Sequence, residues 1–293
     1  MQKATCICVP LWQGAEKQGP ESAPQALLDS GADKILQRYF DTDFVTLPAI
    51  KEQITPHNKY AVLARYMQRL KHTVSDSIAH GAFPFILGGD HALGLGSVAG
   101  ASEHYDNLGL IWFDAHGDMN TEATSPTGHI HGMPIAALMG LCASGLNNVA
   151  TRRIKPENIF WIGTRSLDRG EKELIERMQL HVYTTEEVRT EGMSHIMERV
   201  RKDILQNGIS HLHCSVDIDA MDPTIVTATG VAEPDGLMTD EYKQFADLLP
   251  ELPIRLTSLD FVEYNPLLDD ETQSTRQWCL NAIDYLIKAI SGK

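Results

Sequence analysis

Short apolar segments recur along this chain, and segments with a helical period separate most of them. Such alternation is typical of a mainly parallel sheet whose crossover helices cover both faces. The sequence therefore predicts an α/β fold, a three-layer α/β/α sandwich with eight strands at residues 4–10, 44–47, 83–87, 108–113, 158–162, 180–183, 212–216 and 255–261. The main helices are expected at residues 60–79, 92–101, 168–178, 193–205, 242–249 and 275–290. A further amphipathic helix should begin near Pro20 and Pro24 and carry Leu27, Leu28 and Ile35.

No internal repeat, low-complexity tract or Pro/Ser-rich linker divides the 293 residues. The composition of 43% hydrophobic and 22% charged residues is ordinary for a soluble globular protein. A chain of this length can form one large α/β domain or two smaller ones. Because no linker is visible, we expect a single domain spanning residues 1–293.

Charge, cysteines and hydropathy restrict the partners and the compartment. The formal net charge is −14 at pH 7 and no Lys/Arg-rich segment offsets it, which argues against a nucleic-acid partner. The five cysteines form no C-x-x-C pair, as expected of free thiols in a reducing compartment, and Cys6 and Cys8 should face one core layer. Residues 1–14 lack a secretory pattern, and residues 133–146 are too short and interrupted to span a bilayer. We expect a cytoplasmic protein without membrane contact.

Four of the apolar segments end in acidic residues or histidine rather than in ordinary turn residues. Ligands of open α/β sheets bind at the carboxyl ends of the strands, so these side chains should meet at one edge. A single Asp at such a position can be a helix cap, but capping does not readily explain all four. The residues are His91, then Asp114, His116 and Asp118, then Asp217 and Asp219, and finally Glu263.

The segment Asp-Ala-His-Gly-Asp after residues 108–113 has the donor set of a metal site. Asp114, His116 and Asp118 alternate, so an extended segment carries all three to one side. The alternative is an N-cap Asp, a surface His and a loop Asp. Carboxylate oxygens and imidazole nitrogens together suit Mn²⁺, Zn²⁺, Fe²⁺ or Co²⁺ rather than Ca²⁺. Mn²⁺ is the leading candidate.

Six candidate ligands are too many for one ion but suit two. Two imidazoles and four carboxylates, two of them bridging, can hold a pair of cations about 3.5–4 Å apart that acidifies a shared water for hydrolysis. Without cations the carboxylates would repel one another and raise one another's pKa values. The predicted ligands are His91, Asp114, His116, Asp118, Asp217 and Asp219.

Several motifs together resemble those of the ureohydrolases, the arginase/agmatinase family, and most closely those of arginases. They are G-G-D-H at 88–91, D-A-H-G-D-M-N at 114–120, G-H-I-H-G at 128–132, S-V-D-I-D-A-M-D-P at 215–223 and E-Y-N-P at 263–266. The resemblance extends over nearly the whole chain. It implies the arginase-like sandwich, a dimanganese site, and hydrolysis of a guanidino group by a metal-bridging hydroxide.

The resemblance also assigns roles to individual residues. It places His91 and Asp118 on one ion and His116 and Asp219 on the other, with Asp114 and Asp217 bridging them. Asp118 therefore counts among the catalytic residues as well. His131 matches the family's proton-shuttle histidine, and Glu263 matches the acidic residue that faces the guanidinium. A planar cation favours a bidentate carboxylate, which agrees with the second role.

Substrate choice depends on residues around the metals. Asn120, Thr127 and Ser125 match positions that hold an α-carboxylate in arginases, and Asp168 and Glu171 match positions that hold an α-amino group. Together they favour L-arginine, hydrolysed to L-ornithine and urea, since agmatine lacks the carboxylate. For Asp168 and Glu171 a helix N-terminal role is the alternative, because acidic residues are favoured there.

Two further predicted substrate contacts, His129 and Val231, depart from the usual arginase pattern. His129 stands where that loop commonly has Asn, and Val231 replaces the Thr expected after A-T-G; the A-E-P-D-G that follows is also atypical. Alternatives are therefore a sister ureohydrolase acting on N-hydroxyarginine, agmatine or another guanidino or formimino compound, or a catalytically silent metal-binding regulatory protein. By resemblance we expect a homo-oligomer, a trimer or hexamer, with a small guanidino compound as its only other partner.

Overall fold

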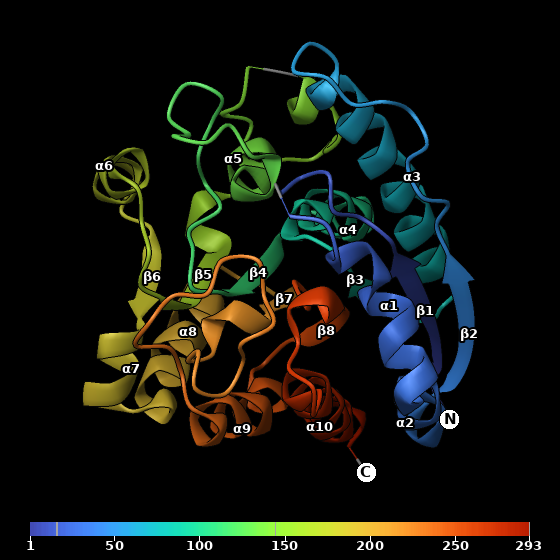
Figure 1. Ribbon diagram of the computed structural model, residues 1–293. Helices are drawn as coiled ribbons and strands as arrows, with labels where there is room; N and C mark the ends of the chain where they lie inside the picture. Colours follow the sequence, from blue (N-terminus) through green and yellow to red (C-terminus); the bar gives the residue numbers. More distant parts are fainter. Residues whose placement is uncertain (16, 144, 293) are drawn as a thin grey trace.

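The computed structural model describes residues 1–15, 17–143 and 145–292. Eight strands form one sheet in the order β2-β1-β3-β8-β7-β4-β5-β6, and all of their pairings are parallel. The expected mainly parallel sheet is confirmed (Figure 1). The strands are β1 Lys3–Val9, β2 Asp41–Thr46, β3 Phe83–Gly88, β4 Leu108–Phe113, β5 Ile159–Thr164, β6 His181–Thr184, β7 His211–Asp217 and β8 Arg255–Val262.

Helices follow most strands, as the alternating pattern predicts. The α-helices are α1 Ala23–Leu27, α2 Asp33–Tyr39, α3 Lys59–Ala79, α4 Gly94–Ser102, α5 Pro134–Met139, α6 Arg169–Met178, α7 Thr185–Glu191, α8 Met193–Gln206, α9 Thr239–Leu248 and α10 Ser274–Ser291. Short 3-10 or π turns are η1 Pro20–Ser22, η2 Leu28–Ala32, η3 His91–Leu93, η4 Ile130–Gly132, η5 Gly145–Asn148, η6 Pro156–Asn158, η7 Ile218–Ala220, η8 Leu249–Glu251 and η9 Pro266–Leu268.

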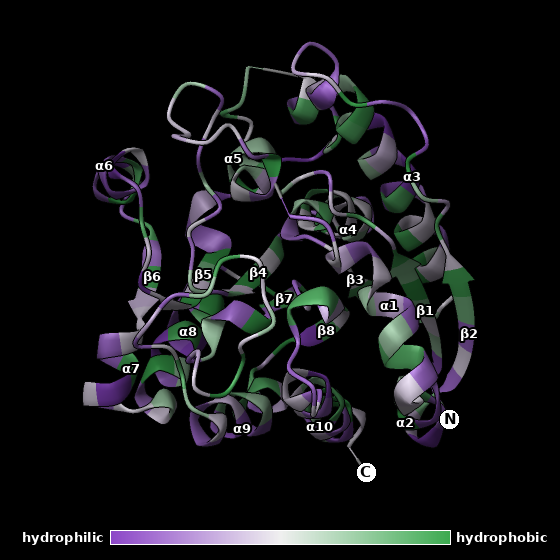
Figure 2. Ribbon diagram, viewed as in Figure 1, coloured by the Kyte–Doolittle hydropathy of each residue, from purple (hydrophilic) through white to green (hydrophobic). Residues whose placement is uncertain are grey.

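Two separate cores lie on the two faces of the sheet. Within β4, Leu110 and Trp112 point to the core shared with α3, α4 and α5, whereas Ile111 and Phe113 point to the core shared with α1, α2, α8, α9 and α10. This alternation is the period-two pattern of a strand that is buried on both faces. Helices such as α3 and α9 carry hydrophobic and hydrophilic segments side by side (Figure 2), because only one of their faces packs on the sheet. The three-layer α/β/α sandwich is therefore confirmed.

Two helices were not expected from the sequence. Helix α5 is only 6 residues long and begins with a proline, and α7 is only 7 residues long and mostly polar. Neither segment is long enough to show a clear helical period of apolar residues. Helix α7 instead begins with a capping box, in which Thr184 and Glu187 bond each other's backbone N–H groups. The helix expected after Pro20 and Pro24 is divided into α1 and α2 by the turn η2, in which Gly31 has the non-helical φ of 110°. Elsewhere, expected and observed ends of the main elements differ by a few residues.

The cysteines agree with the prediction of free thiols. All five are buried and unpaired. Cys6 and Cys8 lie in the same core, on the face of β1 that α1, α2 and α10 cover. Among the described residues, no helix combines the length and the apolar composition that crossing a membrane requires.

The strand order gathers the acidic strand ends. Strands β3, β8, β7 and β4 are consecutive neighbours in the middle of the sheet, although β7 and β8 come last in the sequence. These are the four strands that are followed by His91, Glu263, Asp217 and Asp114. All four residues therefore leave the sheet at the same carboxyl edge, as predicted.

Candidate metal centre and active site

A tight turn after β3 delivers His91 to the sheet edge. A Cβ on Gly89 would lie 1.8 Å from the carbonyl oxygen of Leu11, so only glycine fits this close approach of two backbone segments. The buried carboxylate of Asp90 accepts hydrogen bonds from Gly14 N (2.8 Å) and Ala92 N (3.0 Å) and so fixes the turn. The His91 ring, 1% exposed, then stacks on Trp112 with ring centroids 3.9 Å apart.

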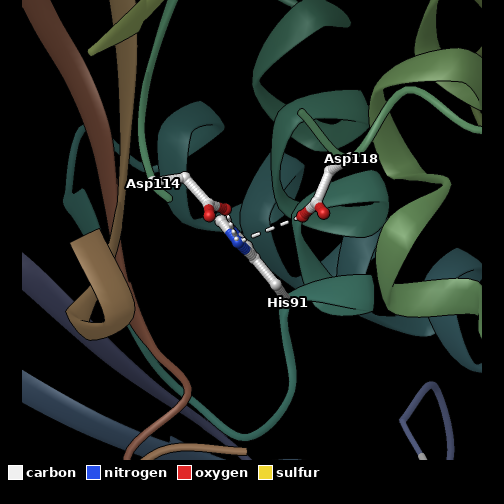
Figure 3. Close-up of side chains that lie close together, drawn as sticks. All are labelled: His91, Asp114 and Asp118. Carbon is white, nitrogen blue, oxygen red and sulfur yellow. Dashed lines mark ion pairs between the residues drawn. The ribbon is translucent and has the colours of Figure 1, made fainter. Parts of the chain in front are cut away.

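Three carboxylates surround the Nδ1 atom of His91. It lies 2.8 Å from Asp114 Oδ2, 3.1 Å from Asp217 Oδ2 and 3.3 Å from Asp118 Oδ2. Figure 3 shows this ring between the carboxylates of Asp114 and Asp118, which approach it from opposite sides. The carboxyl ends of β3, β4 and β7 thus supply one compact group of nitrogen and oxygen donors.

A second group adjoins the first and shares Asp114 with it. The Nδ1 atom of His116 lies 3.0 Å from Asp219 Oδ2 and 3.4 Å from Asp114 Oδ1. Two sets of potential ligand atoms therefore exist, one with His91, Asp114 and Asp118 and one with Asp114, His116 and Asp219. Asp114 belongs to both groups, whereas Asp217, the other residue predicted to bridge two ions, belongs to neither. The assignment of residues to two ions stays a prediction.

The geometry of these contacts fits cation ligands better than hydrogen-bond partners. His91 Nδ1 and Asp114 Oδ2 are buried and only 2.8 Å apart, yet neither has a hydrogen bond of acceptable geometry among the described residues. Burial and neighbouring carboxylates raise the pKa of Asp118 and of Asp217 well above the usual range. A buried cluster of this kind is stable in its ionised form when positive ions neutralise it.

Unusual backbone conformations aim two of the acidic side chains. Asp118 has φ 49° and Glu263 has φ 68°, both in the left-handed region that non-glycine residues rarely adopt. Such conformations are concentrated at functional sites, where the surrounding structure outweighs their cost of about 1–3 kcal/mol. Here Glu263 is held because its backbone N–H donates to Gly89 O at 2.9 Å.

Buried polar residues behind His91 fix the orientation of its ring. The Nε2 atom lies 2.8 Å from Ser215 Oγ, and Ser215 donates in turn to Asp260 Oδ2 at 3.1 Å. With Nε2 engaged there, Nδ1 is left to face the ligand cluster, an arrangement that metal-binding histidines commonly show. The sequence analysis missed Asp260, although a charged residue inside the apolar segment 255–261 was a visible signal.

His131 and Glu263 form a pair beside the cluster. His131 Nδ1 lies 3.2 Å from Glu263 Oε1, which also accepts the backbone N–H of His91 at 2.7 Å. Burial by itself would lower the pKa of His131, but the adjacent Glu263 carboxylate outweighs it and raises the pKa to about 9. The imidazole is therefore protonated at neutral pH and can donate a proton.

One pocket collects nearly all the predicted site residues. Its lining includes five of the six predicted ligands, while Asp114 is buried beneath it. The two remaining predicted catalytic residues and all seven predicted substrate contacts also line it. These are His131, Glu263, Asn120, Ser125, Thr127, His129, Asp168, Glu171 and Val231.

Several of the predicted substrate contacts also hold the pocket wall together. Asn120 Nδ2 donates to Asp168 Oδ2 at 2.8 Å, and Ser125 Oγ accepts the N–H of Gly128 at 2.9 Å. Glu171 accepts the N–H groups of Met119 (3.1 Å) and Asp168 (2.9 Å), so the helix N-terminal role is present at this residue. Burial raises the pKa of Glu171 to about 7. Contacts of these residues with a substrate stay a prediction.

Two polar side chains that sequence reasoning did not select, those of Ser166 and Glu233, line the pocket together with Gly132. Glu233 belongs to the atypical A-E-P-D-G segment, which was the available signal. Ser166 and Glu233 lie next to Arg165, which is partly buried. The guanidinium of Arg165 donates to several backbone carbonyls, including Asp219 O at 2.8 Å and Glu233 O at 2.9 Å.

Comparison with known proteins agrees with this geometry. The model of the arginase family matches residues 2–287. An arginase of Brevibacillus brevis is 37% identical over 278 residues, which cover 92% of this chain and 93% of the relative. An arginase of Bacillus caldovelox is 35% identical over 284 residues and covers 94% of each chain.

Solved structures of arginases also have the fold of this protein. The structure of an Entamoeba histolytica arginase in complex with L-ornithine superposes with a TM-score of 0.91 at 31% identity, over 98% of each chain. The native structure of the Bacillus caldovelox arginase gives a TM-score of 0.90 at 33% identity, over 100% of this chain and 99% of that one. The protein belongs to the arginase family.

Proposed function

We propose that this protein hydrolyses the guanidino group of L-arginine, yielding L-ornithine and urea, with the help of two Mn²⁺ ions. The observation that carries the proposal is the pair of donor groups that share Asp114 directly beneath a pocket containing His131 and Glu263. Relatives that are called arginases and match over nine-tenths of their length support the choice of substrate.

The six predicted ligands fit the proposed ions. His91 and Asp118 would hold one, His116 and Asp219 the other, and Asp114 and Asp217 both. Oxygen and imidazole donors without thiolate suit Mn²⁺, although Zn²⁺ or Co²⁺ can bind the same donor set. When bound, two such cations lower the pKa of a shared water and so supply the nucleophile for hydrolysis.

The other pocket residues would orient the substrate and move a proton. Glu263, 3% exposed and aimed by its left-handed backbone, is placed to accept hydrogen bonds from the guanidinium. His131, whose Nδ1 atom lies 3.2 Å from Glu263 Oε1, is placed to donate a proton to the leaving amine. At the outer end, Asn120, Thr127 and Asp168 would distinguish an amino-acid substrate from a simple amine.

Urea release by Mn²⁺-loaded protein tests this proposal. We expect L-arginine to be preferred in kcat/KM over N-hydroxyarginine, agmatine and shorter guanidino acids. The variant Asp118→Asn should abolish turnover of every substrate, while Asp235→Asn, an exposed change on the pocket's outer loop, should leave turnover unchanged. Absence of urea from L-arginine with bound Mn²⁺ would refute the assignment of substrate.

A sister ureohydrolase is the second candidate, and Val231 favours it. This apolar side chain is 40% exposed on the pocket wall, where a hydroxyl is expected in an arginase. If agmatine or N-hydroxyarginine exceeds L-arginine in kcat/KM, the second candidate holds. If the unmodified Mn²⁺-loaded protein turns over no guanidino or formimino compound, so that Asp118→Asn has no activity to abolish, the catalytically silent protein holds instead.

Assembly and location are part of the proposal as well. We infer a single catalytic domain over residues 1–293 that acts in the cytoplasm as a homo-oligomer, a trimer or hexamer. Light scattering after size exclusion measures the mass directly, and a monomer of 32.5 kDa at working concentration would contradict the oligomer.

A further inference from the structure

The two metal-binding histidines differ in how their outer ring nitrogens are held. His91 Nε2 has Ser215 Oγ at 2.8 Å, with Asp260 behind it. His116 Nε2 is buried as well, yet it has no hydrogen-bond partner among the described residues. If Nδ1 of His116 binds an ion, its ring must carry the proton on Nε2, and this N–H then needs an acceptor.

Glu233 presents a carboxylate to that nitrogen. Its Oε1 atom lies 3.8 Å from His116 Nε2, and both side chains line the pocket. A shift of about 0.6–1 Å would bring the two atoms within the 2.7–3.2 Å of an N–H···O hydrogen bond. The Glu233 side chain is 32% exposed, so it has room for such a shift.

Neighbours that also support the ligand cluster hold Glu233 close to His116. Ser166 Oγ donates a hydrogen bond to Glu233 Oε1 at 3.1 Å. The backbone of Ser166 also pairs with that of His116 in an isolated parallel β-bridge. Arg165 Nη2 donates to the carbonyl of Glu233 at 2.9 Å and to that of Asp219 at 2.8 Å. One framework therefore holds two of the predicted ligands and the Glu233 carboxylate together.

We propose that Glu233 is a positioning residue for the ion assigned to His116 and Asp219. Its carboxylate accepts a hydrogen bond from the Nε2–H group of His116, and so fixes the tautomer and the ring orientation that aim Nδ1 at the ion. This inference rests on the proposed metal site, but not on which guanidino compound is the substrate. Partners of this kind typically change metal affinity by about 10–100-fold when they are removed.

The test is calorimetric titration of metal-free protein with Mn²⁺, which reports the affinity of each site without any turnover. Glu233→Ala should weaken one of the two sites about 10–100-fold and leave the other unchanged. Glu233→Gln keeps an acceptor oxygen while removing the charge, so it should stay close to the unmodified protein. Asp235→Asn, which removes an equal charge from the same loop, should change neither site.

Three outcomes would overturn the inference. Equal affinities in Glu233→Ala and the unmodified protein would show that His116 needs no such acceptor. Equal losses in Glu233→Gln and Glu233→Ala would show that only the negative charge matters. Failure of the unmodified protein to bind two ions would refute the proposed metal site, and with it the role of Glu233. Binding of two ions without urea release would refute the proposed function alone, because the comparison of variants still decides the role of Glu233.

Discussion

Gly89 joins three parts of the active-site edge, and replacing it with alanine should disturb all of them. Its N–H donates to Val9 O at 3.0 Å at the end of β1, and its carbonyl accepts the N–H of Glu263 at 2.9 Å after β8. A Cβ here would lie 1.8 Å from the carbonyl oxygen of Leu11. Since the obstacle is backbone, no side-chain rotation can relieve the clash.

The size of the effect follows from that distance. The Cβ and the Leu11 oxygen must separate by about 1.6 Å to reach the 3.4 Å of an ordinary contact. Overpacking of this kind costs about 3 kcal/mol, the upper end of the usual range. For a chain of this size the melting temperature should fall by roughly 5 °C. A displacement of about 1 Å at Glu263 or His91 should also lower kcat/KM by about 100-fold.

Thermal unfolding of Gly89→Ala measures the loss of stability, Mn²⁺ titration measures the disturbance at His91, and urea release measures the loss of kcat/KM, with Gly132→Ala as the matched control. Gly132 is on the same pocket, but a Cβ there meets no atom within 4 Å. The control should keep the melting temperature and the Mn²⁺ affinity of the unmodified protein. If Gly89→Ala behaves like the control in all three assays, the close backbone approach does not determine the geometry of the site.

Three further predictions concern the metals, His131 and Arg165. Chelation should lower stability by about 2.7 kcal/mol for each of the two proposed ions, about 5.4 kcal/mol together, relative to protein with Mn²⁺ at 100 times the Kd of both sites, and equal melting curves would exclude metal binding. In metal-free protein the folded pKa of His131 is raised to about 9, so its pairing with Glu263 stabilises the fold fully below about pH 6.5 and less as the pH rises through 9. Denaturation of His131→Gln should therefore show a larger loss at pH 6 than at pH 10, and a loss independent of pH would contradict this. Arg165→Lys removes guanidinium bonds to several carbonyls and should cost about 2 kcal/mol in chemical denaturation, whereas an unchanged midpoint would show that these bonds contribute nothing.

Much of the fold and of the site could be predicted because each signal is local. Apolar segments of strand length, separated by helical periods, predict the eight strands and the three layers. The six donor residues and His131 lie within short motifs that follow those strands. Helices α5 and α7 escaped prediction because they are short, and α7 depends on its capping box more than on a hydrophobic face.

What the sequence by itself determined is therefore the set of elements and the chemistry that each strand end carries. Only the tertiary structure placed β8 and β7 between β3 and β4, and so brought His91 onto Ser215, 124 residues further along the chain. The same packing set the Glu233 carboxylate 3.8 Å from His116 Nε2. Such contacts join residues distant in sequence, and no local pattern encodes them. They depend on the order in which the strands pair. That order is decided when helices cover both faces of the whole sheet.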